Sequence, residues 1–150
     1  MGKWHIAAAG LAVVAVSTSS SAGRSRAQDA IVGVWLVEHP TAPFPLHLYV
    51  FNADHTMQQA NPDAGNPRSS DSDGKGVWTR RGDRITGKWV EIIADRTTHK
   101  LSGRGELTFE IVLSGDHLTG KGTFLLYDPA GARTGDAIDA PFTGTRVKAP

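Results

Sequence analysis

The sequence contains no cysteine. This absence excludes disulfide-stapled toxins and growth factors, thiol catalysis, thiolate zinc sites and an acyl anchor on a lipobox cysteine. A folded domain must therefore be held together by its hydrophobic core and its backbone hydrogen bonds. An apolar run long enough to cross a bilayer as a helix is also lacking, since the run over residues 6–16 is too short.

That short run belongs to a three-part N-terminal pattern. Lys3 precedes it, and the small polar residues STSSSAG follow it. A basic residue, a short apolar stretch and small residues, in that order, are typical of a secretory signal peptide. We expect cleavage after Ala27, with cleavage after Ala22 as the alternative. The sequence thus predicts a signal peptide over residues 1–27, a single domain over residues 28–150, a periplasmic or secreted location, and no stable membrane insertion after cleavage.

An excess of charge of one sign is lacking as well. The chain has 16 Lys and Arg residues and 15 Asp and Glu residues, a formal net charge of +1. Removing residues 1–27 takes away three basic residues and no acidic one, which leaves 13 minus 15, or −2. A slightly acidic domain without a run of Lys and Arg has no electrostatic footprint for nucleic acid. We therefore expect no nucleic-acid partner.

From residue 31 onward, stretches rich in Val, Ile, Leu, Thr and aromatic residues alternate with clusters of Gly, Asp, Asn and Pro. This pattern is typical of β-strands joined by turns. Most connections are hairpin-sized, which favours an antiparallel meander, and closure into a barrel removes the exposed edges of an open sheet. The predicted fold is all-β, an eight-stranded antiparallel up-and-down barrel, with strands over residues 31–38, 45–52, 55–60, 76–81, 84–94, 99–113, 117–127 and 137–147.

Gly33, Val34 and Trp35 on the first predicted strand, together with Arg146 on the last, resemble the pattern of the lipocalins and related calycin barrels, here in a minimal bacterial form. In that family a Gly-x-Trp motif opens the barrel, and the Trp packs against a basic residue of the final strand. The resemblance implies that Trp35 plugs the barrel floor with Arg146 stacked over it, an arrangement that cation–π attraction favours. Gly33, Trp35 and Arg146 would then close the barrel structurally.

Strand parity predicts the residues of the barrel interior, because successive side chains of a strand point to opposite faces. With Trp35 facing inward and the aromatic face of the second strand assigned to the interior, the predicted ligand-binding residues are His47, Tyr49, Phe51, Trp78, Trp89, Glu91, Phe109 and Phe124. An apolar interior with a few polar groups is typical of a small-molecule site. Side chains alone can also fill an eight-stranded barrel, so a hollow and a filled interior both remain open.

Three functions fit these observations. The first is a carrier that binds a small apolar or amphipathic molecule inside the barrel. The second is a lyase, isomerase or cyclase without a cofactor, in which His47 or Glu91 is the base and Tyr49 is the proton donor or oxyanion partner. The third is an interaction or inhibitor module that acts through the two predicted loops, residues 39–44 and 61–75. The sequence has no phosphate-binding loop, dinucleotide fingerprint or Gly-x-Ser-x-Gly elbow.

No metal site is predicted. His39, His55, His99 and His117 lack the His-x-His or His-x-x-x-His spacing that places two ligands on one face. Residues 71–74, Asp-Ser-Asp-Gly, are similar to the start of a calcium-binding loop, but the third oxygen ligand and the closing Glu are absent. A solvated loop is the expected structure there.

Overall fold

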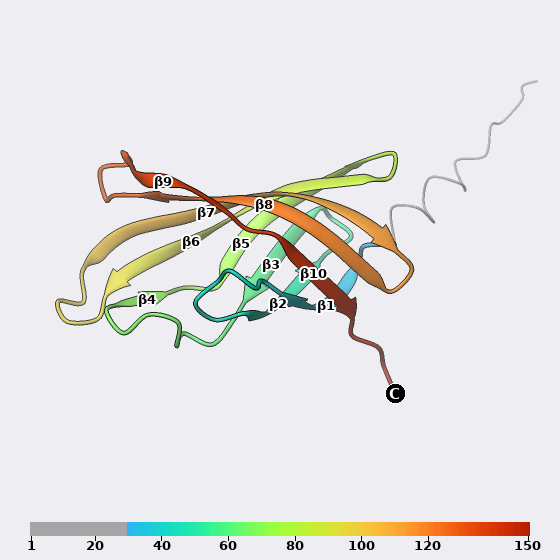
Figure 1. Cartoon of the computed structure of the whole chain (residues 1–150), viewed down its shortest axis with the longest axis horizontal. Helices are drawn as coiled ribbons and strands as arrows, with labels where there is room; N and C mark the ends of the chain where they lie inside the picture. The colour runs from blue at the N-terminus through green and yellow to red at the C-terminus, as the bar shows by residue number, and fades with distance from the viewer. Residues whose placement is uncertain (1–29) are drawn as a thin grey trace, which may run out of the picture.

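The computed structural model describes residues 30–150, so the predicted signal peptide and both predicted cleavage positions lie outside the described residues. No helix in the described part of the chain is long and apolar enough to cross a membrane. The described residues form ten strands (Figure 1): β1 Gly33–Glu38, β2 Leu46–Phe51, β3 Thr56–Ala60, β4 Ser69–Asp71, β5 Gly74–Arg81, β6 Arg84–Asp95, β7 Leu101–Ser114, β8 His117–Tyr127, β9 Arg133–Asp139 and β10 Phe142–Arg146.

The ten strands form one closed antiparallel sheet. Neighbours pair in the order β10-β1-β2-β3-β5-β6-β7-β8-β9, and β10 also pairs with β8, which closes the ring. β4 extends β5, because both pair with β6. β9 and β10 likewise share β8, and reciprocal backbone hydrogen bonds between Gly122 and Ala140 join their ladders. The segments therefore make an eight-stranded antiparallel barrel, as the sequence predicts.

The prediction of a loop over residues 61–75 is wrong at its C-terminal end. β4 and the first residues of β5 lie there, although Ser and Asp have low β-propensity. The ladder to β6 carries on across the gap between β4 and β5, since the Ser72 N–H donates to Ile92 O and the Ser72 hydroxyl accepts from the Ile92 N–H, both at 3.0 Å. Pairing with β6 thus overrides the local composition.

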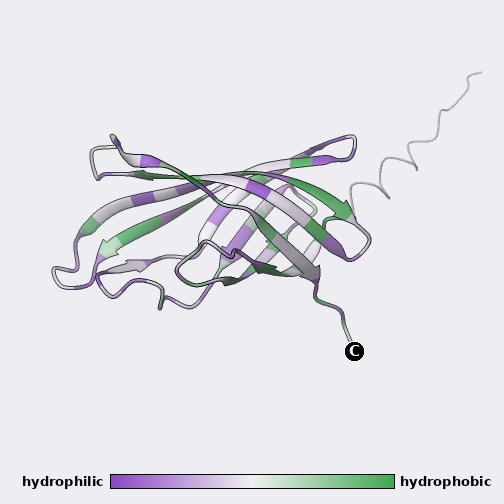
Figure 2. Cartoon of the chain, in the orientation of Figure 1, coloured by the Kyte–Doolittle hydropathy of each residue, from purple (hydrophilic) through white to green (hydrophobic). Residues whose placement is uncertain are grey.

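The last predicted strand, residues 137–147, is longer and is broken in two. β9 begins at Arg133, and the break falls at Ala140 and Pro141. Proline has no N–H to donate to a ladder, so it is placed at interruptions of a sheet. Figure 2 shows apolar and polar stretches alternating along the strands.

Large aromatic side chains fill one half of the barrel. Trp35, Tyr49, Phe51 and Trp78 are each no more than 3% exposed. Phe109 continues this packing, because its ring lies edge-on to Phe51, 6.2 Å between centroids. Edge-to-face aromatic contacts of this kind add to the free energy gained by burial.

Arg146 and Trp35 close this filled half. The Arg146 guanidinium carbon lies 4.3 Å from the centroid of the indole ring. Its Nη1 donates to Val32 O at 2.9 Å, and its Nε forms an ion pair with Asp116 at 3.2 Å. The indole N–H of Trp35 donates to Ile31 O at 2.8 Å. This is the arrangement that the resemblance to lipocalins implies.

We expect Gly33→Ala to lower the free energy of unfolding by about 1–3 kcal/mol. Gly33 has a φ of +134°, which L side chains rarely adopt, and a Cβ there would lie 2.8 Å from Arg146 Nη1. Urea unfolding measures the loss. Gly82→Ala is the control, since Gly82 also has a positive φ, +62°, but open space around it. Equal losses in the two variants would show that displacement of Arg146 contributes nothing.

Candidate functional site

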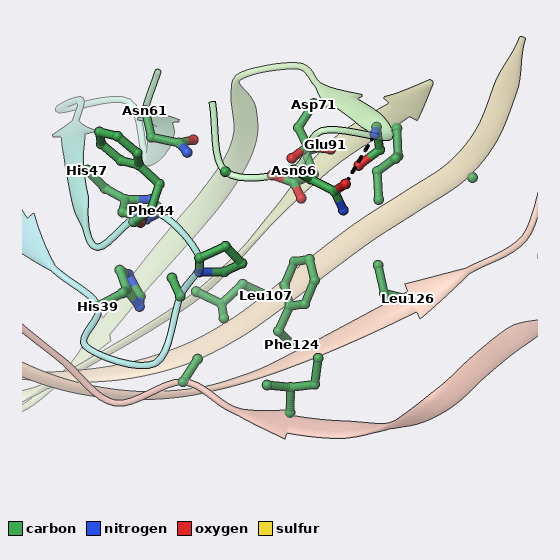
Figure 3. A pocket seen from close by; sticks show the side chains of 18 of the residues that line it. His39, Phe44, His47, Asn61, Asn66, Asp71, Glu91, Leu107, Phe124 and Leu126 are labelled. Atoms are coloured by element: carbon green, nitrogen blue, oxygen red, sulfur yellow. Dashed lines mark hydrogen bonds between the residues drawn. The ribbon is translucent and has the colours of Figure 1, made fainter. Parts of the chain in front are cut away.

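The other half of the barrel is hollow and holds a cavity of about 570 Å³. The register of β6 separates the two halves: Ile85 is buried in the filled half, whereas Trp89, Glu91 and Ile93 line the cavity. Figure 3 shows Leu107, Phe124 and Leu126 along one side of the cavity. Small-molecule sites have volumes of roughly 300–1,000 Å³, so this cavity has the size of such a site.

The two longest connections contribute to the wall of the cavity. Residues 39–44 supply Thr41, Pro43 and Phe44, and the start of the second connection supplies Asn61, Gly65 and Asn66. The connections touch each other, because a Cβ at Gly65 would lie 3.4 Å from Pro43 Cβ and 3.5 Å from Phe44 Cβ. Both loops therefore belong to the same site.

The predicted interior residues divide between the two halves. Four of them line the cavity: His47, Trp89, Glu91 and Phe124. The other four are packed in the buried core: Tyr49, Phe51, Trp78 and Phe109. Strand parity predicts which side chains face inward, but it does not predict how far along the barrel axis each one lies.

His39 and His47 form a pair that sequence reasoning missed. Their ring centroids are 4.8 Å apart, and both line the cavity. His39 follows Val37 at the next inward position of the chain, and Val37 lies opposite His47 in the β1–β2 register. The two imidazoles are therefore diagonal neighbours on the inner face. Continuing the parity of β1 by two residues would have found this pair.

Burial favours the neutral forms of both imidazoles, and hydrogen bonds fix their orientation. His47 Nε2 lies 2.8 Å from Phe44 O, so it carries the proton and donates, and Nδ1 accepts from Gln59 Nε2 at 2.9 Å. The Tyr49 hydroxyl accepts from Trp89 Nε1 at 3.2 Å and donates to His39 Nε2 at 2.8 Å. Burial, and next the nearby His47, lower the pKa of His39 to about 3. Burial also lowers the pKa of His47.

Glu91 and Asp71 form a second pair, this time of carboxyl groups. Asp71 on β4 lies opposite Ile93 on β6, which brings it diagonal to Glu91. Figure 3 shows the two carboxyl groups close together, near Asn66. Burial, and next the charge of Asp71, raise the pKa of Glu91 to about 8. Burial, followed by the charge of Asp63, also raises the pKa of Asp71, against the opposing effect of Arg96.

The structure does not join His47 to Glu91. His47 bonds Phe44 and Gln59, whereas the charged neighbour of Glu91 is Asp71. Figure 3 shows His47 and Glu91 on opposite sides of the cavity. The acid/base couple considered from the sequence is therefore not formed. Within residues 30–150, no group of three or more His, Asp or Glu side chains is placed to hold a metal ion.

Comparison with known proteins gives no relative for this chain. The sequence matches no protein-family model, and no match was found among curated proteins or solved structures. The function must therefore be inferred from the cavity and the side chains that line it.

Proposed function

We propose that this protein is an exported, lipocalin-like carrier that binds a small, partly apolar molecule in the hollow half of its barrel. The observation that supports this proposal is the cavity of about 570 Å³, whose apolar wall is interrupted by a few polar groups. Closed barrels with such interiors commonly hold one small ligand. The stacking of Arg146 on Trp35 supports the lipocalin-like assignment, and the N-terminal sequence pattern supports export.

The apolar wall provides the driving force for binding. Leu107, Phe124 and Leu126 come from the adjacent strands β7 and β8, and they present carbon atoms to the cavity. A ligand that buries about 200 Å² of apolar surface against them would gain about 5 kcal/mol before the cost of ordering it. The polar groups at the two sides of the cavity would then fix its orientation.

Two of the polar groups, His39 and Tyr49, are poorly suited to acid/base catalysis. A general base works best with a pKa near the operating pH, and the pKa of His39, lowered to about 3, makes this imidazole a weak base. The Tyr49 side chain is fully buried, and burial raises its pKa, so the hydroxyl keeps its proton. This hydroxyl is already hydrogen-bonded to His39. These two groups therefore stabilise the wall, which leaves the enzyme hypothesis without an effective base at this side of the cavity.

Blocking the cavity is the direct test. We expect Leu126→Trp to weaken binding of the neutral dye N-phenyl-1-naphthylamine by about tenfold or more, because an indole would occupy space that the ligand needs. Dye fluorescence on titration measures the affinity. The control is Val112→Trp, since Val112 is 53% exposed and is not part of the cavity wall.

Circular dichroism would confirm that both variants are folded. Equal dye affinity in the wild type and in Leu126→Trp would contradict binding in this cavity. Failure of the wild type to bind any compound of a broad apolar panel would contradict the carrier function itself.

A further inference from the structure

We propose that the ligand is an amine, a molecule with an apolar body and one ammonium group, and that Glu91 and Asp71 bind the ammonium group. This inference rests on the proposed carrier function and names the chemical class of its ligand. It is carried by the charges of the cavity wall, by the surroundings of Glu91 and by the position of Asp71.

The wall can carry negative charge only. Among the described residues, none of the lysines or arginines lines the cavity. Arg96 acts electrostatically on Asp71, but its guanidinium is held by the Asp63 carboxylate at 2.6 Å and by backbone oxygens, among them Ser69 O at 2.7 Å. The two histidines are neutral because burial lowers their pKa values. An anionic ligand such as a fatty acid would enter without a positive partner, which is costly in a buried site.

Glu91 presents a carboxyl group to the cavity that makes no hydrogen bond to the described protein. Its residue is 9% exposed, its side chain lines the cavity, and it has no hydrogen-bond partner within residues 30–150. The large majority of buried polar side chains in proteins are hydrogen-bonded. A donor supplied by a ligand would satisfy this carboxyl group.

Gly105 lets the Glu91 carboxyl group lie close to the ring of Phe124. It lies opposite Glu91 in the β6–β7 register, and a Cβ there would lie 2.8 Å from both Glu91 Oε1 and Phe124 Cε2. The missing side chain therefore brings a carboxyl group and an aromatic ring over the same point of the backbone. An ammonium group is attracted both to a carboxylate and to an aromatic ring, so it is the group that this combination suits.

Asp71 distinguishes an amine from a neutral ligand. A protonated Glu91 by itself could bond an alcohol or a carbonyl group. The second carboxyl adds a charge of the same sign, and Figure 3 shows it on the same side of the cavity. A single cation would relieve both carboxyl groups, and charge-assisted hydrogen bonds are roughly twice as strong as neutral ones.

The pH dependence of binding follows from the groups that face Glu91. These are Asp71 from β4, with Asp63 and Arg96 next to Asp71, and Tyr49 from β2, which stays protonated because burial raises its pKa. β7 presents Gly105, β8 presents Phe124, and β5 contributes no side chain to the wall. Because the pKa of Glu91 is raised to about 8, amine binding below that pH must release its proton. Amine affinity should rise toward pH 8, by up to about tenfold per pH unit.

Calorimetric titration with three probes of equal chain length tests the proposal. The probes are decylamine, decanol and decanoic acid, each kept below its aggregation concentration. At about pH 7.5 we expect decylamine to bind about tenfold tighter than decanol, and decanoic acid to bind weakest. Glu91→Gln should weaken decylamine about tenfold and leave decanol within about twofold. The control is Glu110→Gln, because Glu110 pairs with Arg84 and Lys121 and is not part of the cavity wall.

The outcomes separate the two proposals. Equal affinities for decylamine and decanol, or an amine affinity that does not change between about pH 6 and 8, would overturn the amine assignment and leave the carrier function standing. If no probe binds and the apolar panel also fails, the carrier function itself is overturned. The wild-type selectivity and the proton release do not depend on whether Glu91→Gln folds.

Discussion

Replacing Trp35 by alanine is expected to lower the free energy of unfolding by about 3–5 kcal/mol. Trp35 is fully buried, and it is covered by the Arg146 guanidinium. Its removal would leave a large void in a packed half-barrel and would leave Ile31 O without its indole donor. The guanidinium would also lose the ring on which it stacks. Urea unfolding of the two proteins, followed by far-UV circular dichroism, measures the difference.

Trp35→Phe separates these contributions. It keeps an aromatic ring beneath Arg146 but removes the N–H that bonds Ile31 O, so a smaller loss of about 1–2 kcal/mol is expected. A loss below about 1 kcal/mol in Trp35→Ala would show that the pair of Trp35 and Arg146 does not close the barrel in the way described.

Stability is expected to be highest between about pH 4.5 and 6.5 and to fall on both sides, because Glu91 and the two histidines titrate in opposite senses. The pKa of His39 falls from 6.5 in the unfolded chain to about 3. As the pH drops below 6.5, the unfolded chain takes up a proton that the folded chain does not, so stability is lost. The lowered pKa of His47 acts in the same direction.

Glu91 produces the loss on the alkaline side. Its pKa rises from 4.5 in the unfolded chain to about 8. Its contribution to stability is fully present below pH 4.5 and is lost as the pH rises through 8, since only the unfolded chain has released the proton in between. Between 4.5 and 6.5 the effects of Glu91 and the histidines oppose each other. Between 6.5 and about 8 the histidines no longer contribute, and Glu91 lowers stability by up to about 1.4 kcal/mol per pH unit.

Two variants assign these slopes. Glu91→Gln should remove the fall between about pH 6.5 and 8, and His39→Gln should reduce the fall below about pH 4.5. Urea unfolding of the ligand-free proteins at intervals of about one pH unit gives both slopes. If Glu91→Gln loses stability above pH 6.5 as steeply as the wild type, then Glu91 is not the group that titrates there.

The barrel could be predicted from the sequence because its signal is local. Runs of β-forming residues separated by short turns predicted the antiparallel meander, and the parity of the strands predicted that His47, Trp89, Glu91 and Phe124 face inward. Whether such a residue lines the cavity or packs in the core depends on its position along the barrel axis. That position is set by the register of the strand with partners that are distant in the chain, and no local sequence pattern encodes this register.

The partners in the site were missed for a related reason. His39 and Asp71 lie in segments whose Pro, Ser and Asp content favours loops. Asp71 becomes part of a strand only because β4 pairs with β6, and His39 faces inward only because it continues the inner face of β1. The sequence therefore predicted His47 and Glu91 as site residues, whereas their neighbours His39 and Asp71 became evident only in the structure.

The split of the barrel into a packed half and a hollow half has a consequence for how such a protein can diverge. Burial is concentrated around Trp35, Phe51 and Trp78, whereas Leu126 and Ile138 on the cavity wall are only partly buried or exposed. Substitutions at such wall positions should therefore carry a small thermodynamic penalty, whereas those in the packed half, or at the buried wall residues Trp89 and Leu107, carry a large one. Homologous barrels could exchange one cargo for another by drift at the wall while purifying selection holds the packed half unchanged.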